Sequence, residues 1–173
     1  MPTGTTVHIR PAASGDTAET ARVWQAGWLD GHLGHVPEEL LAVRGPEYFT
    51  EQAAAWVDST LLAVTPDGTV VGMVVVAGNE LVQLAVDPRA RRRGAGTALL
   101  RAAQDRISEH HDTAWLAVVP GNSRARDFYQ RHGWTDSGPV IHAAPAGAGA
   151  VAETIPVPVH RYTIGLTNGR NPR

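Results

Sequence analysis

The chain of 173 residues (18.4 kDa) has a hydrophobic fraction of 43% and a formal net charge of −2. This length and composition predict one globular domain over residues 1–173, and the weakly acidic balance gives no sign of a nucleic-acid or membrane partner. The absence of cysteine excludes disulfides, a thiolate zinc site and a covalent cysteine intermediate. Because the first residues lack the apolar core of a signal peptide and no apolar run is long enough to span a membrane, we expect a cytoplasmic protein.

The N-terminal segment predicts a strand followed by a helix. Residues 7–11 alternate apolar and polar side chains and end in proline, which is typical of a short edge strand. Ser14 or Asp16 can cap the helix that follows. We expect the buried side of this helix to carry Ala21, Trp24 and Trp28, which recur at helical spacing.

The next segment, residues 27–37, mixes glycine, tryptophan and histidine before two further helices, which we expect over residues 37–43 and 47–57. His32 and His35 are three residues apart, a spacing that two metal ligands can have. No third ligand stands nearby in the sequence, so we expect no metal site there.

Three apolar runs separated by two short turns predict an antiparallel meander. The runs cover residues 61–65, 70–77 and 81–86, and the turns contain Pro-Asp-Gly and Gly-Asn. The third run is almost wholly apolar, which is typical of a strand that is buried on both faces. Asp87 and Pro88 end this strand.

A basic loop that contains glycine follows the third strand and opens a helix that ends near His110. The first turn of a helix leaves about four N–H groups without partners and carries a partial positive charge, so an anion is its natural ligand. Gly94 and Gly96 would let a bulky diphosphate approach the main chain, residues 91–93 add three arginines, and Thr97 adds a hydroxyl. The alternative is a tight turn that the arginines keep solvated. The spacing fits neither a P-loop nor the dinucleotide-binding fingerprint.

Another strand, expected over residues 113–119, should lie parallel to the strand at residues 81–86, because a helix crosses over between them. A further helix then begins near Asn122 and ends at Gly133. Taken alone, Asn122 is a helix cap and Tyr129 is a core aromatic residue. The His-His-Asp sequence just before the strand is better explained as a solvated helix end than as a metal site.

Two motifs in this order resemble those of the GNAT superfamily of N-acetyltransferases. Arg91-Arg92-Arg93-Gly94-Ala95-Gly96, with the strand before it and Thr-Ala-Leu-Leu after it, is similar to the acetyl-CoA-binding motif of that family. Residues 122–134 resemble its second signature. The resemblance implies an α/β fold of the α+β type, with a mixed, mainly antiparallel central sheet flanked by helices. It also implies direct transfer of an acetyl group from acetyl-CoA to an amine, without a metal.

The same resemblance implies a binding site for acetyl-CoA in the cleft where the strands at Leu81 and Ala114 part. In the family, the glycine-containing loop binds the CoA pyrophosphate through main-chain N–H groups, and the preceding strand pairs with the pantetheine arm as an added strand would. Asn122 would contact the pantetheine, and Tyr129 would give a proton to the departing CoA sulfur. The residues expected to bind acetyl-CoA are Leu84, Ala85, Val86, Arg91, Arg92, Arg93, Gly94, Ala95, Gly96, Thr97, Asn122 and Ala125.

A catalytic base and an acceptor pocket are also implied. Glu80 stands at the start of the central strand, where several GNAT enzymes place a glutamate that takes a proton from the amine. The alternative for Glu80 is an exposed carboxylate in a turn. Trp28, His32 and His35 would contact the acceptor, because the segment between the first two helices lines the acceptor pocket in GNAT folds. Otherwise Trp28 belongs to the core and the two histidines to an ordinary loop.

Residues 138–158 are rich in alanine, glycine and proline and predict a mobile insertion between a strand after Trp134 and a last strand at residues 157–166. A frayed tail is expected at residues 167–173. The insertion would either cover the acceptor pocket or contact a second subunit of a homodimer. We expect the acceptor to be a small-molecule amine or a protein N-terminus. A hypothesis from another class is a non-catalytic sensor of acyl-CoA, which would need the loop but neither Glu80 nor Tyr129.

Overall fold

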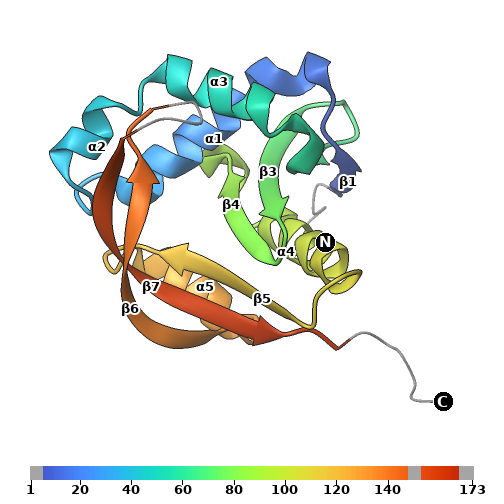
Figure 1. Cartoon of the computed structure of the whole chain (residues 1–173). Helices are drawn as coiled ribbons and strands as arrows, with labels where there is room; N and C mark the ends of the chain where they lie inside the picture. The colour runs from blue at the N-terminus through green and yellow to red at the C-terminus, as the bar shows by residue number, and fades with distance from the viewer. Residues whose placement is uncertain (1–5, 148–152, 168–173) are drawn as a thin grey trace.

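The computed structural model describes residues 6–147 and 153–167, which include one seven-stranded sheet in the order β1-β2-β3-β4-β5-β7-β6. Figure 1 shows α1 and α3 on one side of β3 and β4, and α4 on the other. The strands are β1 (His8–Pro11), β2 (Thr60–Val64), β3 (Val70–Ala77), β4 (Glu80–Val86), β5 (Thr113–Val118), β6 (Thr135–Pro145) and β7 (Thr154–Gly165). The α-helices are α1 (Thr17–His32), α2 (Glu38–Ala42), α3 (Pro46–Ala55), α4 (Ala95–Ser108) and α5 (Ser123–Arg131).

The predicted fold class is confirmed, because every neighbouring pair of strands is antiparallel except β4 and β5, which are parallel. The crossover expected between these two strands is also present, since α4 connects them. A short helical turn, η3 (Pro88–Ala90), stands between β4 and α4.

Residues of β3 are buried on both faces of the sheet, which explains their nearly continuous apolar sequence. Met73 and Val75 belong to the core that includes Trp24 of α1, whereas Val74 belongs to the core on the α4 side. Each of these three β3 side chains is fully buried. Burial of a side chain of this size contributes about 1.5–3 kcal/mol, so the two cores hold both helices on the sheet.

A bulge in β4 changes which side chains face each helix. Val75 pairs with Gln83, but the next residue of β3, Val76, pairs with Leu81, so β4 contains one extra residue at this point. Leu81 and Leu84 therefore pack on the α4 side although they are three residues apart, while Val82 packs on the α1 side. The bulge bends β4 just where its partner β5 diverges from it.

The parallel strands β4 and β5 part almost at once. Glu80 opposite Trp115 is the one registered pair that joins them within the described part of the chain, and the Trp115 N–H donates to the Asn79 carbonyl at 3.1 Å. Figure 1 shows the two strands separating beyond this point. Both strands keep a neighbour on the other side, β3 for β4 and β7 for β5, so each has one open edge along the gap.

The prediction of an insertion over residues 138–158 is wrong for its described residues. Residues 138–145 belong to β6 and residues 154–158 belong to β7, and the two strands form a long hairpin that rises beside α2 (Figure 1). Prolines are tolerated here because β7 pairs with β5 only from His160 onward. Over Pro156 and Pro158 the edge of β7 that faces away from β6 is unpaired, so the N–H that proline lacks can belong to that edge. Residues 148–152, and nearly all of the predicted tail, lie outside the described residues.

Candidate active site

A cleft of about 70 Å³ occupies the gap between β4 and β5. Its walls are residues 81–84 of β4 and residues 116–119 at the end of β5, and His32 of α1 and residues of α5 complete it. The open backbone edges of both strands therefore face a space into which an extended ligand can insert as a strand would. The predicted site residues that line this cleft are Leu84, Asn122, Ala125, Tyr129 and His32.

The start of α4 is at the end of β4, with the loop of residues 91–94 before it. Gly94 adopts a left-handed conformation (φ 83°) with open space around it, and Arg92 does so too (φ 63°). The Gly94 carbonyl accepts the first helical hydrogen bond, from Ala98 N–H at 3.0 Å, so the N–H groups before Ala98 have no partner within the helix. Donors of this kind at a helix start, beside a glycine, are what a pyrophosphate site would need.

Residues predicted to touch the cofactor differ in what they can offer. Ala85 and Ala95 are buried, with 4% and 2% of their surfaces exposed, so only their backbones can meet a ligand. Arg92 and Arg93 are exposed. Gly96 is close to Val86 of β4, because a Cβ on this glycine would lie 3.7 Å from a Val86 methyl group.

Asp30 of α1 joins the loop to α5, a contact that the sequence did not predict. It accepts a hydrogen bond from Arg91 at 2.7 Å and also forms an ion pair with Arg124 of α5. Partial burial disfavours the ionised carboxyl, but the hydrogen bonds from the two arginines outweigh this and lower the pKa of Asp30. Two cations are thus held at the mouth of the cleft by one carboxylate.

Asp87 fixes the beginning of the loop. Its side chain accepts from Arg89 N–H at 3.0 Å and forms ion pairs with Arg89 at 3.1 Å and with Arg22 of α1 at 2.9 Å. These bonds, led by the one from the Arg89 side chain, hold the pKa of Asp87 well below its usual range. The carboxylate therefore stays ionised and ties the end of β4 to α1.

The hydroxyl of Thr97 is engaged with α5. Nδ1–H of His132 donates to the Phe128 carbonyl at 2.7 Å, which leaves Nε2 of His132 to accept from the Thr97 hydroxyl at 3.2 Å. This tautomer is assigned from the hydrogen-bond pattern. Thr97 can thus offer a ligand its backbone N–H, while its hydroxyl joins α4 to α5.

The start of α5 closes the far wall of the cleft. The Asn122 side chain accepts from Ala125 N–H at 3.2 Å and so caps the helix, as its sequence position predicted. Its amide nitrogen lies against Gly31 of α1, where a Cβ would come within 2.6 Å of it. Similarly, a Cβ on Gly27 would lie 2.7 Å from the Cβ of Ala85. Two glycines thus let α1 cross close over the cleft.

Tyr129 lies in the wall of the cleft and in the core at once. It is 7% exposed and makes edge contacts with Phe128 and Trp134, at ring distances of 5.3 and 5.9 Å. Its hydroxyl has no hydrogen-bond partner among the described residues. Burial raises the pKa of Tyr129, so the hydroxyl stays protonated throughout the neutral range.

Glu80 is at the closed end of the gap, one residue before the lining of the cleft begins. Burial raises the pKa of its carboxyl, and the positive charge of Arg161 on β7 acts in the opposite direction. The guanidinium of Arg161 lies 4.2 Å from the centre of the Trp115 ring, across from Glu80. Glu80 is therefore half-buried rather than an exposed turn carboxylate.

The three residues predicted to meet the acceptor have different environments. His32 lines the cleft, its Nδ1–H donates to the Trp28 carbonyl at 2.8 Å, and burial lowers its pKa. Trp28 is 7% exposed and stacks on the His32 ring at 4.5 Å, so it supports His32 from the core. His35 is exposed and its ring lies against Gly121, where a Cβ would overlap it.

Within residues 6–147 and 153–167, no group of three or more His, Cys, Asp or Glu side chains is arranged to hold a metal ion. No helix in the same ranges is both long and apolar enough to span a membrane.

Two parallel strands that part, with a helix N-terminus beside their gap, form a site that suits an extended ligand with an anionic group. The chain belongs to the acetyltransferase (GNAT) family, whose model matches residues 32–134. The resemblance seen in the two sequence motifs is thereby confirmed. The general reaction of this family is acetyl transfer to an amine.

The chain is similar to the mycothiol acetyltransferase of Clavibacter sepedonicus, with 36% identity over 133 residues that cover 73% of this chain. It spans only 43% of the length of that relative. Among solved structures, a GCN5-related N-acetyltransferase from Rhodopseudomonas palustris superposes with a TM-score of 0.70 at 20% identity, covering 93% of this chain and 96% of the other. The PaiA N-acetyltransferase of Thermoplasma acidophilum, solved with coenzyme A, gives 0.67 at 18% identity over 90% and 98% of the two chains.

Proposed function

We propose that the chain catalyses direct transfer of the acetyl group of acetyl-CoA to an amine held in the cleft between β4 and β5. The observation that carries this proposal is the single Glu80–Trp115 pair, beyond which both strands present open edges to the cleft. Acetyl-CoA supplies the acetyl group as an activated thioester. The absence of cysteine supports direct transfer, because no thiol is present to carry the acetyl group.

The donor site in this proposal has two parts. The N–H groups at the start of α4 bind the pyrophosphate, and Arg91 lies beside them on Asp30. Leu84 and Asn122 line the part that takes the pantetheine arm, and backbone N–H near Val86 stabilises the charge that develops on the acetyl oxygen. Arg92 and Arg93 add positive charge around the loop.

Glu80 serves as the base in this proposal, directly or through a water molecule. A free amine has a pKa of about 10.4 and is mostly protonated at neutral pH, so a group must remove its proton before it can attack. Half-burial supports this role because it moves the pKa of Glu80 toward neutral pH.

The acceptor enters on the α1 side, where His32 lines the cleft and Trp28 holds the His32 ring in place. His35, near the end of β5, is part of the entrance. The acceptor is a small-molecule amine or a protein N-terminus. The similarity to an enzyme named for mycothiol supports a small molecule. In this proposal the β6–β7 hairpin either covers the acceptor or contacts a second subunit.

Tyr129 donates a proton to the departing sulfur in this proposal, and Tyr129→Phe tests it. The substitution keeps the ring and its packing, so we expect the single-turnover rate to fall about a hundredfold while acetyl-CoA affinity is unchanged. Release of CoA with a panel of amines gives the acceptor, and stopped-flow kinetics gives the rate. Tyr162→Phe is the control, because Tyr162 is also buried and its ring lies 6.4 Å from the Tyr129 ring, outside the cleft lining, where its hydroxyl accepts from Arg126 at 3.0 Å.

A Phe variant that keeps the wild-type single-turnover rate would show that Tyr129 is a packing residue. If acetyl-CoA binds but no amine in the panel releases CoA, the chain is a sensor rather than an enzyme.

A further inference from the structure

Arg44, between α2 and α3, is a buried cation without an anion. It is 6% exposed, and its Nη1 is shielded from solvent and has no hydrogen-bond partner. No carboxylate lies within ion-pair distance of it among the described residues. A guanidinium has five N–H donors and keeps its charge. Burying it without a counter-ion is unfavourable, so an anion bound beside it would be stabilised.

Aromatic and imidazole rings surround this guanidinium. It lies 4.0 Å from the centre of the Tyr48 ring and 5.9 Å from that of Trp28. His32 of the cleft and His142 of β6 are close enough that its charge lowers the pKa of both, although burial is the larger cause in each case. Neutral rings stabilise a cation by their faces but leave its in-plane N–H groups free for an acceptor of hydrogen bonds.

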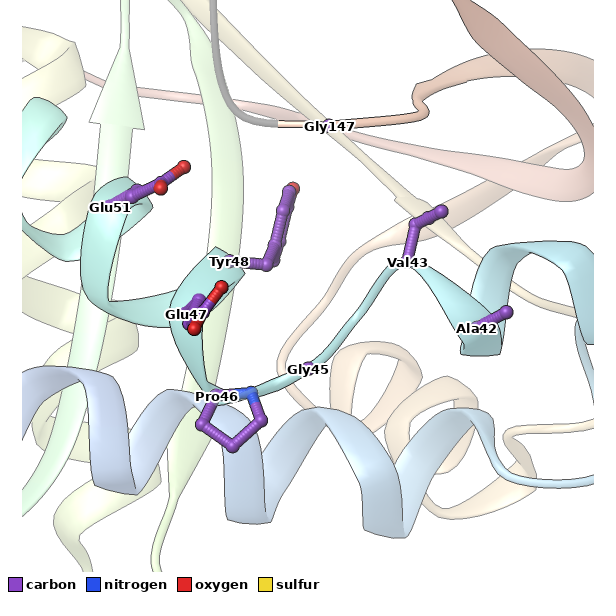
Figure 2. Close-up of a pocket in the computed structure, with 8 residues that line it drawn as sticks. All are labelled: Ala42, Val43, Gly45, Pro46, Glu47, Tyr48, Glu51 and Gly147. Atoms are coloured by element: carbon purple, nitrogen blue, oxygen red, sulfur yellow. The ribbon is translucent and has the colours of Figure 1, made fainter.

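Two cavities lie near Arg44, each lined by its neighbours rather than by Arg44 itself. On one side, Trp28 stacks on His32, which lines the acetyl-transfer cleft. On the other side is a larger cavity of about 520 Å³, lined by both sequence neighbours of Arg44, by Tyr48 and by Gly147 of the β6–β7 hairpin. Figure 2 shows the Tyr48 ring and the Val43 side chain pointing from the α2–α3 region toward Gly147.

We propose that Arg44 binds a carboxylate of the acceptor, so that the substrate class is an amine that carries a carboxylate group. This inference rests on the acetyl transfer proposed above. The guanidinium matches a carboxylate with two parallel hydrogen bonds, which also orients the acceptor. The carboxylates that line the larger cavity, Glu47 and Glu51, are exposed at its rim, where water screens them. They do not neutralise Arg44.

The test compares amino acids with their carboxamides as paired acceptors, by CoA release. We expect the wild type to use the carboxylate member about tenfold to a hundredfold better in kcat/KM, through KM. In Arg44→Gln this preference disappears because the KM of the carboxylate member rises, while kcat and the Kd of acetyl-CoA stay the same. Arg101→Gln is the control, because it removes one exposed arginine of α4 and should leave the preference intact. Equal use of both members by the wild type, or an unchanged preference in Arg44→Gln, overturns the proposal.

Two further measurements separate this proposal from misfolding and from failure of the enzymatic function. Arg44→Met fills the same space without charge, and it should lose the preference while its Tm stays the same or rises. A large fall in Tm would instead show that Arg44 is a structural cation. If no amine is acetylated, the Arg44 Nε resonance is followed by NMR during titration with N-acetyl-alanine and N-acetyl-alaninamide in the presence of CoA. A shift with the carboxylate alone supports the anion site, and no shift at millimolar concentrations overturns it.

Discussion

With Glu80 as the proposed base, burial of its carboxyl should affect both the pH dependence of the reaction and that of stability. Because burial raises the pKa of Glu80, kcat/KM should increase with pH as this carboxyl ionises. Glu80→Gln should remove this pH-dependent increase and lower the rate about a hundredfold. The pH profile of kcat/KM measures this, with the exposed Glu109→Gln as control. A wild-type profile in Glu80→Gln would assign the base to another group.

The same carboxyl affects stability with a definite sign. A carboxyl with a raised pKa binds its proton more tightly in the folded chain, so its contribution is fully present below the unfolded pKa of about 4.3. The contribution is lost as the pH rises through the folded pKa. Glu80→Gln should therefore match or exceed the wild-type Tm at neutral pH, which thermal unfolding checks.

The conformation of Gly94 gives a sharp test of the pyrophosphate site. The residue has a φ of 83° and open space around it, so Gly94→Glu places a carboxylate among the donors at the start of α4 without a steric clash, although the left-handed backbone is strained by any side chain. We expect the Kd for acetyl-CoA to rise by more than about tenfold, or about 1.4 kcal/mol, in calorimetry. Gly68→Glu is the matched control, since Gly68 has a φ of 88° in an open turn of the β2–β3 hairpin. Equal affinity in both variants would place the pyrophosphate elsewhere.

Local sequence patterns predicted the residues that act through the backbone, but not those that act through distant contacts. The glycine loop and the Asn122 cap are encoded in adjacent residues, so spacing alone identifies them. Asp30 and Arg91 meet across 61 positions of the chain, and nothing in either neighbourhood predicts the contact. The burial of Arg44 depends in the same way on rings from α1 and α3.

At the scale of elements, periodicity placed the first five strands and all of the longer helices close to their observed positions. The last two strands were predicted but extend further into the expected insertion, because alanine and proline weaken the strand signal and the reason they are tolerated is topological. β7 is not paired with β5 over the segment that contains Pro156 and Pro158. No pattern within the segment itself shows which edge of a strand will be free.

The ion pairs of Asp30 make α1 a support for the donor site, and Asp30→Asn tests this. The carboxylate holds Arg91 and Arg124 in place, so its loss should leave both side chains mobile and raise the Kd for acetyl-CoA by about threefold to tenfold. Calorimetry measures the effect, and Asp127→Asn on the exposed side of α5 controls for the change in charge. Tighter binding in Asp30→Asn would show instead that the carboxylate repels the ligand.

For the whole molecule, the crossover pattern predicted that β4 and β5 are parallel, whereas only the family resemblance implied that they part, as they do beyond Glu80 and Trp115. Their separation follows from tertiary packing, since α1 crosses over the gap where Gly27 and Gly31 permit close approach, and the bulge bends β4. A crossover helix specifies which strands are neighbours. It does not specify for how many residues they remain paired.

The single registered pair at Glu80 and Trp115 divides the sheet into two halves, and we expect these halves to open separately. Without ligand, hydrogen exchange of amides in β2–β4 should report a different opening free energy from that of amides in β5–β7, because one registered pair joins the two halves within the described residues. Saturating acetyl-CoA acts as an additional strand, so both halves should then exchange at a common, slower rate. Hydrogen-exchange mass spectrometry with and without acetyl-CoA measures both values. The substrate that this chain consumes would thus also make its sheet a single cooperative unit.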